Sequence, residues 1–330
     1  MCVGGFFAIF WRTCLTALGW YFVPAKKRDK RQKRKKLHYS LFISSAYQHI
    51  IHMMTLPLLA KRAAIAQLCS TASKHSNLLN VAKCASMAKK QGASMLFLPE
   101  CFGFIGSNAL ETLDNAEVIS TTPLEEGIKA GWLSDLENII ENGDRAVVDG
   151  MNSPPLVLVE NSAVSIVKGL RTIAAKSGLW ISGGGLHEMG APPSPDDESK
   201  TPRVYNTHVI IDSAGQVVTK YRKVHLFDLS IPSEGVHLRE SATTAPGTNL
   251  VVCDSPIGKL GLTTCYDVRF PEMYTALAEE GGADILLVPS AFTVPTGKAH
   301  WHTLLRGKRF YVCMPVFQFL FLLLPFLANE

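Results

Sequence analysis

Three residues of different chemistry each follow an apolar stretch short enough to be a buried strand. Glu100 ends the run LFLPE, Lys223 follows a strand-like run through Tyr221, and Cys265 follows Lys259–Thr264. Runs of this length are too short for a helix and fit strands of a parallel or mixed sheet. A thiol, a carboxylate and an ammonium group at strand ends are the groups that nucleophilic catalysis at a sheet edge needs. We therefore expect one site.

The stretch around the cysteine, GKLGLTTCYDVRFPE, predicts a sharp turn from strand to helix. A turn signal precedes the strand, and Pro271 occupies a position suited to the start of a helix. A cysteine on such a turn projects past the sheet edge, where free backbone N–H groups can stabilise a thiolate or an oxyanion. Taken singly, Cys265 fits a buried small residue, Glu100 a helix-start carboxylate and Lys223 a surface charge. Their joint occurrence favours the catalytic interpretation.

The length of the chain allows one large α/β domain or two small ones and favours one, and we expect no nucleic-acid partner. The chain has 330 residues, of which 47% are hydrophobic, enough for a sizeable core. The formal net charge of +5 comes from Lys26 to Lys36, which holds nine basic residues and one acidic residue. The eight cysteines show no CxxC or paired spacing, so we expect neither zinc nor a disulfide framework, and a reduced compartment fits best. No metal and no cofactor is expected.

A series of ordered motifs resembles the nitrilase (carbon–nitrogen hydrolase) superfamily. Within it the chain is most similar to the Nit branch, in particular to the deaminated glutathione amidases. The motifs cover about residues 62–126 and 168–306 and read IAQLCSTASKHSNL, FLPECFGFIG, GLWISGGGLHE, YNTHVIIDSAGQVVTKYRKVHLFD, RESATTAPG, GKLGLTTCYDVRFPE and LLVPSAFTVPTGKAHWHTLLR. The resemblance implies an α/β fold, a four-layer αββα sandwich of the nitrilase type, here C-terminally incomplete.

The resemblance also implies a role for each site residue. Cys265 is the expected nucleophile, and Glu100 the general base and then acid. Lys223 is expected to favour the thiolate and to stabilise the oxyanion. Glu240 matches the position of the family's supporting glutamate, which holds the lysine in place.

Two further residues are candidates for contact with substrate. The N–H of Tyr266 is expected to help bind the oxyanion. Arg269 could contact a substrate carboxylate, and an ion pair with Glu272 or Asp267 is the structural alternative.

The implied activity is that of an amidase on a small-molecule amide. The resemblance points to the ω-amide of a glutamine-like side chain, with deaminated glutathione as the leading substrate and metabolite repair as the role. An ω-amidase acting on α-ketoglutaramate is the close alternative. From another class, a catalytically impaired scaffold or interaction protein also fits. The family implies a homodimer if the fold is complete.

We divide the chain into three parts. Residues 1–60 form a leader outside the fold, 61–309 the hydrolase domain with an insert at about 128–164, and 310–330 a divergent apolar tail. Met1 to Val23 is apolar and precedes the basic run, so a membrane anchor is an alternative to a disordered or non-native leader. We expect a cytoplasmic location, with mitochondrial, plastid and membrane-anchored locations as alternatives.

The expected elements open with a strand, a helix and a strand. Further along, a Gly-rich tract predicts a closely packed strand, a hairpin follows it, and Ser230–Pro246 reads as a polar loop. These first elements are Arg62–Cys69, Ser73–Gln91 and Ala93–Leu98, the Gly tract is Gly183–Gly185, and the hairpin joins Tyr205–Asp212 to Gln216–Tyr221.

Two segments depart from the family pattern. The insert, Ile128 to Val164, carries no motif, and we expect a dispensable surface excursion. In the tail, Pro315 and Pro325 are expected to prevent a regular central strand, which would leave neighbouring sheet backbone unpaired. That predicts a marginally stable protein with weak activity.

Overall fold

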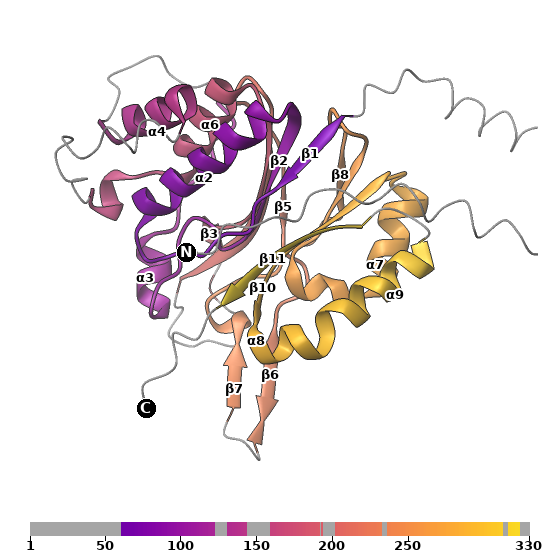
Figure 1. Ribbon diagram of the computed structural model, residues 1–330. Coiled ribbons are helices and arrows are strands. Elements are labelled where there is room, and N and C mark those ends of the chain that lie inside the picture. Colours follow the sequence, from indigo (N-terminus) through magenta and orange to yellow (C-terminus); the bar gives the residue numbers. More distant parts are fainter. Residues whose placement is uncertain are drawn as a thin grey trace, which may run out of the picture. The chain divides into compact units, whose positions relative to one another are not determined.

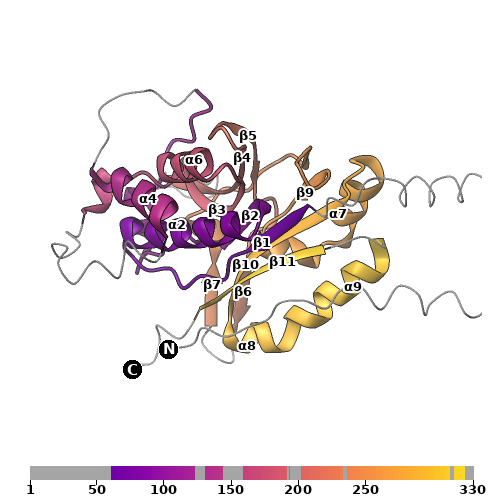
Figure 2. The ribbon, with the colours of Figure 1, turned by 45° about the horizontal axis from the view of Figure 1, so that its top comes forward.

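The computed structural model contains two β-sheets that lie face to face, with helices on both outer sides (Figures 1 and 2). The four-layer α/β sandwich expected from the sequence is therefore confirmed. The structure describes residues 61–122, 131–143, 159–191, 193, 202–232, 236–312 and 316–323. The apolar leader and the basic run lie outside the described residues. No helix in the described ranges is long and apolar enough to cross a bilayer.

The first sheet has the strand order β1-β2-β3-β4-β5 and opens with the predicted strand–helix–strand unit. β1, β2 and β3 are parallel, and β4 and β5 form the predicted antiparallel hairpin. Its outer helices are α2, α4 and α6, and α3 follows β2. The bounds are β1 (Arg62–Ile65), α2 (Lys74–Lys90), β2 (Ala93–Glu100), α3 (Ala109–Asp114), α4 (Gly131–Asn142), α6 (Ile166–Ser177), β3 (Trp180–Ala191), β4 (Arg203–Ile211) and β5 (Val217–Arg222).

The second sheet has the strand order β11-β10-β9-β8. β9 is parallel to β10 and antiparallel to β8, so the mixed sheet predicted for the strand before Cys265 is confirmed. The bounds are β8 (Val251–Cys253), β9 (Leu260–Leu262), the 3-10 helix η6 (Cys265–Arg269), α7 (Pro271–Thr275) with a π-helical turn over Ala276–Glu280, β10 (Ile285–Thr293), α8 (Val294–Thr296) with a π-helical turn over Gly297–Trp301, α9 (His302–Val312) and β11 (Val316–Leu323).

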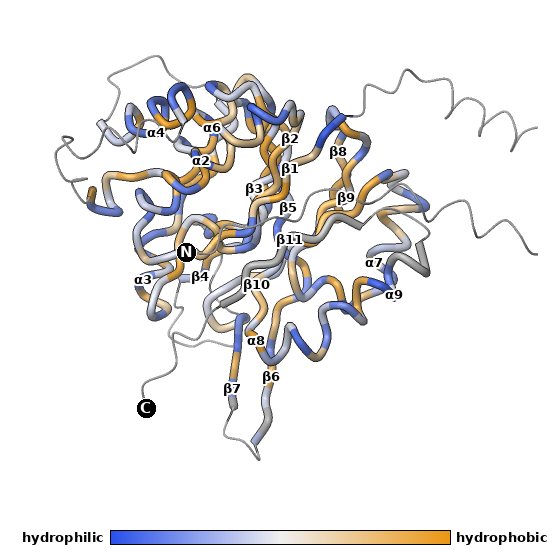
Figure 3. Tube along the Cα trace, viewed as in Figure 1, coloured by the Kyte–Doolittle hydropathy of each residue, from blue (hydrophilic) through white to orange (hydrophobic). Residues whose placement is uncertain are grey.

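The side chains of β2 point alternately to the two faces of the sheet, and this alternation shows how the layers form. Leu96 and Leu98 pack against the helices α2, α4 and α6, whereas Met95 and Phe97 face the second sheet. Successive side chains of a strand point to opposite faces, so a strand covered on both faces is apolar throughout. The hydrophobic stretches along the central strands are visible in Figure 3.

The Gly-rich tract of β3 permits close approach of the chain, as predicted. A Cβ atom on Gly184 would lie 2.2 Å from the carbonyl oxygen of Leu98 and 2.6 Å from Cβ of Pro289. Leu98 belongs to the same sheet, whereas Pro289 belongs to β10 of the opposite sheet. Only glycine fits there without displacing one of these neighbours.

The prediction that the insert is a surface excursion is wrong for residues 131–143. These residues include α4, whose apolar face is buried against α2 and α6 through Trp132, Leu133, Leu136, Ile139 and Ile140. Apolar residues at this spacing occupy one face of a helix, so burial against neighbouring helices stabilises it. Residues 128–130 and 144–158 of the insert lie outside the described residues.

Two other predictions also need correction. Part of the expected polar loop is a hairpin, in which β6 (Asp228–Ile231) pairs with β7 (Val236–Arg239). The backbone of β10 is not left unpaired, because β11 runs parallel to it from Leu286 to Thr293. β11 lies at the edge of its sheet, so the expectation that the tail forms no central strand is consistent with the topology.

Candidate active site

The carboxyl ends of three strands meet between the two sheets. Glu100 ends β2, Lys223 directly follows β5, and Cys265 follows β9 after two residues. β2 and β5 point the same way because two antiparallel pairings separate β5 from β3, which is parallel to β2. The expectation that these strand ends meet is therefore confirmed, with the cysteine coming from the opposite sheet.

Glu100 is a buried carboxylate with donors on both oxygens. It is 4% exposed. Its Oε1 accepts hydrogen bonds from Lys223 Nζ at 3.2 Å and Asn206 Nδ2 at 2.8 Å, and its Oε2 accepts one from the Ala291 backbone N–H at 2.8 Å. A buried carboxylate is costly unless its oxygens are paired in this way. The carboxylate is thus held in one orientation.

Lys223 lies between two carboxylates. Its Nζ donates to both oxygens of Glu240, at 3.0 and 2.9 Å, as well as to Glu100. Burial alone would lower the pKa of Lys223, but Glu100, Cys265 and Glu240 together raise it well above its ordinary value. The ammonium group therefore keeps its charge although the residue is only 2% exposed. Glu240 is itself anchored, because its Oε2 accepts a 2.7 Å hydrogen bond from the Phe227 N–H.

Cys265 occupies a strained turn at the start of η6. Its φ of 49° lies in the left-handed region, which non-glycine residues seldom adopt outside functional sites. Burial raises the pKa of the thiol well above its ordinary value, and Glu100 adds to this, whereas Lys223 and the Ala291 N–H lower it. Lys223 thus lowers the pKa of the thiol, as predicted, but burial and Glu100 raise it by more. The resting thiol keeps its proton beside the Glu100 carboxylate.

Tyr266 and Arg269 lie on the same turn as Cys265. The guanidinium of Arg269 lies 5.6 Å from the centroid of the Tyr266 ring. That ring packs edge-on against Phe227 and Phe270, at 5.1 and 5.7 Å between centroids. In the described part of the chain Asp267 pairs with His225, whose Nδ1 lies 2.8 Å from Oδ1, and the role expected of Arg269 stays a prediction. The N–H of Tyr266 lies in the first turn of η6, where helical N–H groups have no intrahelical partner.

Two groups that contact the site are absent from the residues predicted to form it. Asn206 Nδ2 reaches both carboxylates, at 2.8 Å from Glu100 and 3.4 Å from Glu240. Its position in the Asn-Thr-His segment is a signal that could have identified it. Ala291 contributes only a backbone N–H, for which a sequence carries no side-chain signal.

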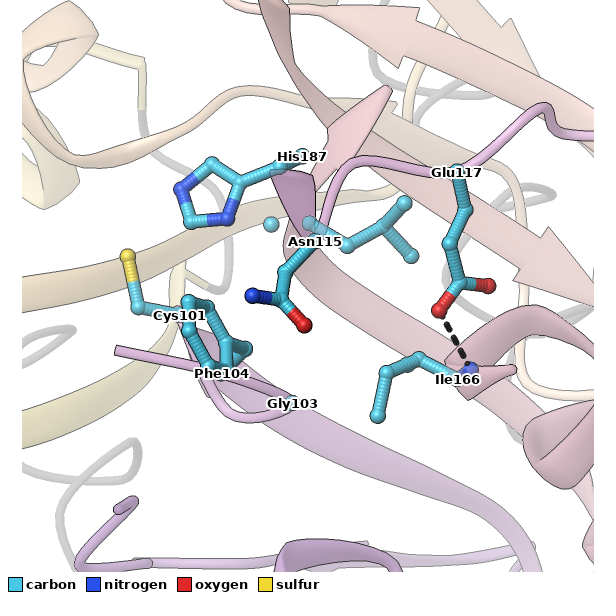
Figure 4. A pocket seen from close by; sticks show the side chains of 9 residues that line it. Cys101, Gly103, Phe104, Asn115, Glu117, Ile166 and His187 are labelled. Carbon is cyan, nitrogen blue, oxygen red and sulfur yellow. Dashed lines mark hydrogen bonds between the residues drawn. The ribbon is translucent and has the colours of Figure 1, made fainter. Parts of the chain in front are cut away.

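A small cavity lies between β3 and the segment that follows β2 (Figure 4). In the figure, Cys101, His187 and Asn115 all point into the same space. Burial lowers the pKa of His187 to about 4, so its ring is neutral near pH 7. The cavity is lined by Cys101, Gly103, Phe104, Asn115, Glu117, Ile166, Gly185, Leu186 and His187. Cys101 directly follows Glu100, so this cavity adjoins the end of β2, and Glu117 is the carboxylate among its lining residues.

Metal ligands do not gather at this site or elsewhere in the described ranges, where no group of three His, Cys, Asp or Glu side chains could hold an ion. The residues that do meet at this site, Glu100, Lys223 and Cys265, can carry acid–base and nucleophilic chemistry. A thiol, a carboxylate that can accept its proton, and a fixed cation form the set required for acyl transfer through a thioester.

A thiol, a carboxylate and an ammonium group between the sheets of an α/β sandwich define the class of protein, and comparison with known proteins identifies its family. A family model described as "Carbon-nitrogen hydrolase" matches residues 62–318. A deaminated glutathione amidase of Dictyostelium discoideum is 38% identical over 250 residues, which is 75% of this chain and 69% of that protein. The human deaminated glutathione amidase is 37% identical over 74% of this chain and 60% of its own length.

A solved structure agrees with the sequence comparisons. The crystal structure of the C. elegans NitFhit protein has a TM-score of 0.56 at 33% identity, covering 78% of this chain and 50% of that one. The chain belongs to the carbon–nitrogen hydrolase family, as its motifs predicted. It spans 69% of the length of the Dictyostelium relative and 60% of the length of the human one.

Proposed function

We propose that this protein hydrolyses the amide of a small glutamine-like compound with Cys265 as nucleophile. The observation that carries the proposal is the buried contact of 3.2 Å between Lys223 and Glu100 beside that thiol. A buried ion pair is weak evidence for stability, and perturbed groups of this kind gather at functional sites. The family and its amidase relatives support the same reaction.

The first half of the reaction forms a thioester. Glu100 takes the thiol proton as the sulfur of Cys265 attacks the amide carbon, so no free thiolate is needed beforehand. Negative charge develops on the amide oxygen, where the Lys223 ammonium and the N–H of Tyr266 stabilise it. Glu100 then gives its proton to the leaving nitrogen, the carbon–nitrogen bond breaks, and a primary amide releases ammonia.

The second half reverses these roles. Glu100 removes a proton from a water molecule, which attacks the thioester carbon. The carbon–sulfur bond breaks, the sulfur takes the proton that Glu100 removed from the water, and the free acid leaves. Glu240 acts by holding Lys223, since both of its oxygens accept from Nζ and Oε2 is fixed by Phe227. Its role is to position the cation.

The leading substrate is deaminated glutathione, because two relatives that match three quarters of the chain carry that activity in their names. Arg269 lies on the turn of the nucleophile beside the Tyr266 ring, and it is our candidate for contact with a substrate carboxylate. A cytoplasmic location and a homodimer stay predictions.

Ammonia release by the purified protein tests this function. We expect turnover of deaminated glutathione in preference to α-ketoglutaramate, loss of turnover in Cys265→Ala, and retention in Cys84→Ala, which alters a cysteine of α2. Iodoacetamide labelling with peptide mass spectrometry should modify Cys265 in competition with substrate. Activity in Cys265→Ala would overturn the assignment, and a folded protein without any amidase activity would favour the scaffold interpretation.

A further inference from the structure

Asp267 is a fully buried carboxylate two residues after Cys265, and it accepts four hydrogen bonds. Its Oδ2 accepts from the Thr264 N–H at 2.8 Å and from the Tyr221 hydroxyl at 2.7 Å. Its Oδ1 accepts from the N–H of His225 at 3.0 Å and lies 2.8 Å from Nδ1 of the same residue. Every partner is adjacent or nearly adjacent to a residue of the proposed site.

These partners come from two separate segments. Tyr221 and His225 flank Lys223 at two residues on either side, and Thr264 directly precedes Cys265. One carboxylate therefore fixes the segment that carries the cation to the turn that carries the nucleophile. Tyr221 strengthens the link, because burial and the neighbouring Asp267 raise the pKa of its hydroxyl, which therefore stays a donor.

We infer that Asp267 is a positioning residue that sets the separation between the Lys223 ammonium and the Cys265 sulfur. The inference rests on the proposed function for its catalytic consequence, but the geometry stands without it. Asp267 makes no hydrogen bond to either group, so it acts only through neighbouring residues of their segments. Cys265 has a φ of 49°, and such a conformation persists only where its surroundings hold it.

The physical reason for such a link is the steep dependence of acyl transfer on geometry. A displacement of about 1 Å at a reacting group can cost about 100-fold in rate. Lys223 lowers the pKa of the Cys265 thiol from the value that burial and Glu100 would otherwise set. If the two segments separate, this lowering is lost, and thiolate formation moves to higher pH.

The test is the Asp267→Asn variant of the full chain. Asparagine keeps the size but turns one acceptor oxygen into an N–H donor that faces existing donors. We expect kcat to fall about 100-fold with little change in KM. We also expect alkylation of Cys265 by iodoacetamide, followed by peptide mass spectrometry across a pH series, to slow and shift to higher pH.

Glu117→Gln is the matched control. Glu117 also accepts four hydrogen bonds, from groups that neither carry nor flank the lysine or the cysteine: Lys74 Nζ, Ser165 Oγ, Ile166 N and Val167 N. We expect this variant to lose thermal stability without changing the pH profile of Cys265 alkylation. Tyr221→Phe removes one of the four hydrogen bonds to Asp267, so it should shift the pH profile of Cys265 alkylation by less than Asp267→Asn does. This variant is the test if Asp267→Asn does not fold.

Two outcomes would overturn the inference. One is a parent-like alkylation profile in Asp267→Asn, or in Tyr221→Phe where the first variant does not fold. The other is an equal shift in Glu117→Gln, since that would reflect general loosening of the fold. Failure of the proposed function looks different, because a parent protein without amidase activity can still show the predicted shift in Cys265 alkylation. That result would leave the positioning role intact.

Discussion

The Glu100 carboxylate accepts a 2.8 Å hydrogen bond from the backbone N–H of Ala291, which joins the end of β2 in one sheet to β10 in the other. The group proposed to move protons is thus oriented by the fold itself. Its second oxygen is left for Lys223 and Asn206. Each sheet contributes to the orientation, so the site exists only where the sheets are correctly stacked.

Glu100→Gln should separate proton transfer from folding. Glutamine keeps an oxygen that accepts hydrogen bonds but cannot take the proton of Cys265, so kcat should fall by about 10²–10⁴-fold. The melting temperature should change much less than activity. Steady-state ammonia release and calorimetry measure both quantities, with the exposed Glu280→Gln as control. Parent-like turnover in Glu100→Gln would assign the proton transfer to another group.

Leu136→Ala should show that the insert belongs to the folded core. Leu136 is fully buried in α4 within the cluster that includes α2 and α6. Truncation of a buried leucine leaves a cavity, so the free energy of unfolding should fall by about 2–5 kcal/mol. Urea denaturation measures it, and Leu110→Ala, at a leucine 70% exposed, is the control. A small effect at both positions would restore the interpretation of a dispensable excursion.

The success and failure of the sequence analysis have physical causes. The meeting of Glu100, Lys223 and Cys265 was predictable because chemistry at a sheet edge requires fixed residue types at strand ends, and their catalytic roles stay proposals. The helix α4 was missed because it carries no family motif, although its apolar residues recur at helical spacing. The bond from Ala291 could not be foreseen, since it comes from the backbone of another sheet. Tertiary contacts of this kind follow only from the packing of the sheets.

His208 should make the protein less stable in mild acid. The residue is fully buried in β4, with Nε2 2.7 Å from Ser182 Oγ and Nδ1 3.1 Å from the carbonyl oxygen of Thr263. Burial lowers its pKa from 6.5 to about 4. As the pH falls through this window, His208 binds a proton in the unfolded chain but not in the folded chain. Its contribution to the free energy of unfolding is therefore complete above pH 6.5 and is lost toward pH 4.

The loss attributable to this histidine should be at most about 3 kcal/mol. We expect His208→Gln to be less stable than the parent near neutral pH, because its buried partners fit worse, but to lose less further stability on acidification. Urea unfolding at about pH 7 and pH 5 gives the change in the free energy of unfolding with pH for the parent and for His208→Gln. His187 titrates in the same direction, with a pKa of about 4, so it remains as a background common to both proteins. Equal slopes would contradict the prediction.

A pair of glycine substitutions should have effects of opposite sign. Alanine at Gly184 would place a Cβ 2.2 Å from the Leu98 carbonyl and 2.6 Å from Pro289 in the opposite sheet. Since backbone cannot yield as a flexible side chain does, we expect Gly184→Ala to destabilise the fold by about 1–3 kcal/mol or more. Gly307 lies within α9, and no atom lies within 4 Å of a Cβ built there. Gly307→Ala should therefore stabilise the protein by about 0.5–1 kcal/mol through helix propensity. Urea denaturation measures the free energy of unfolding of both variants. An alanine tolerated at Gly184 would show that the two sheets do not meet as closely as the structure places them.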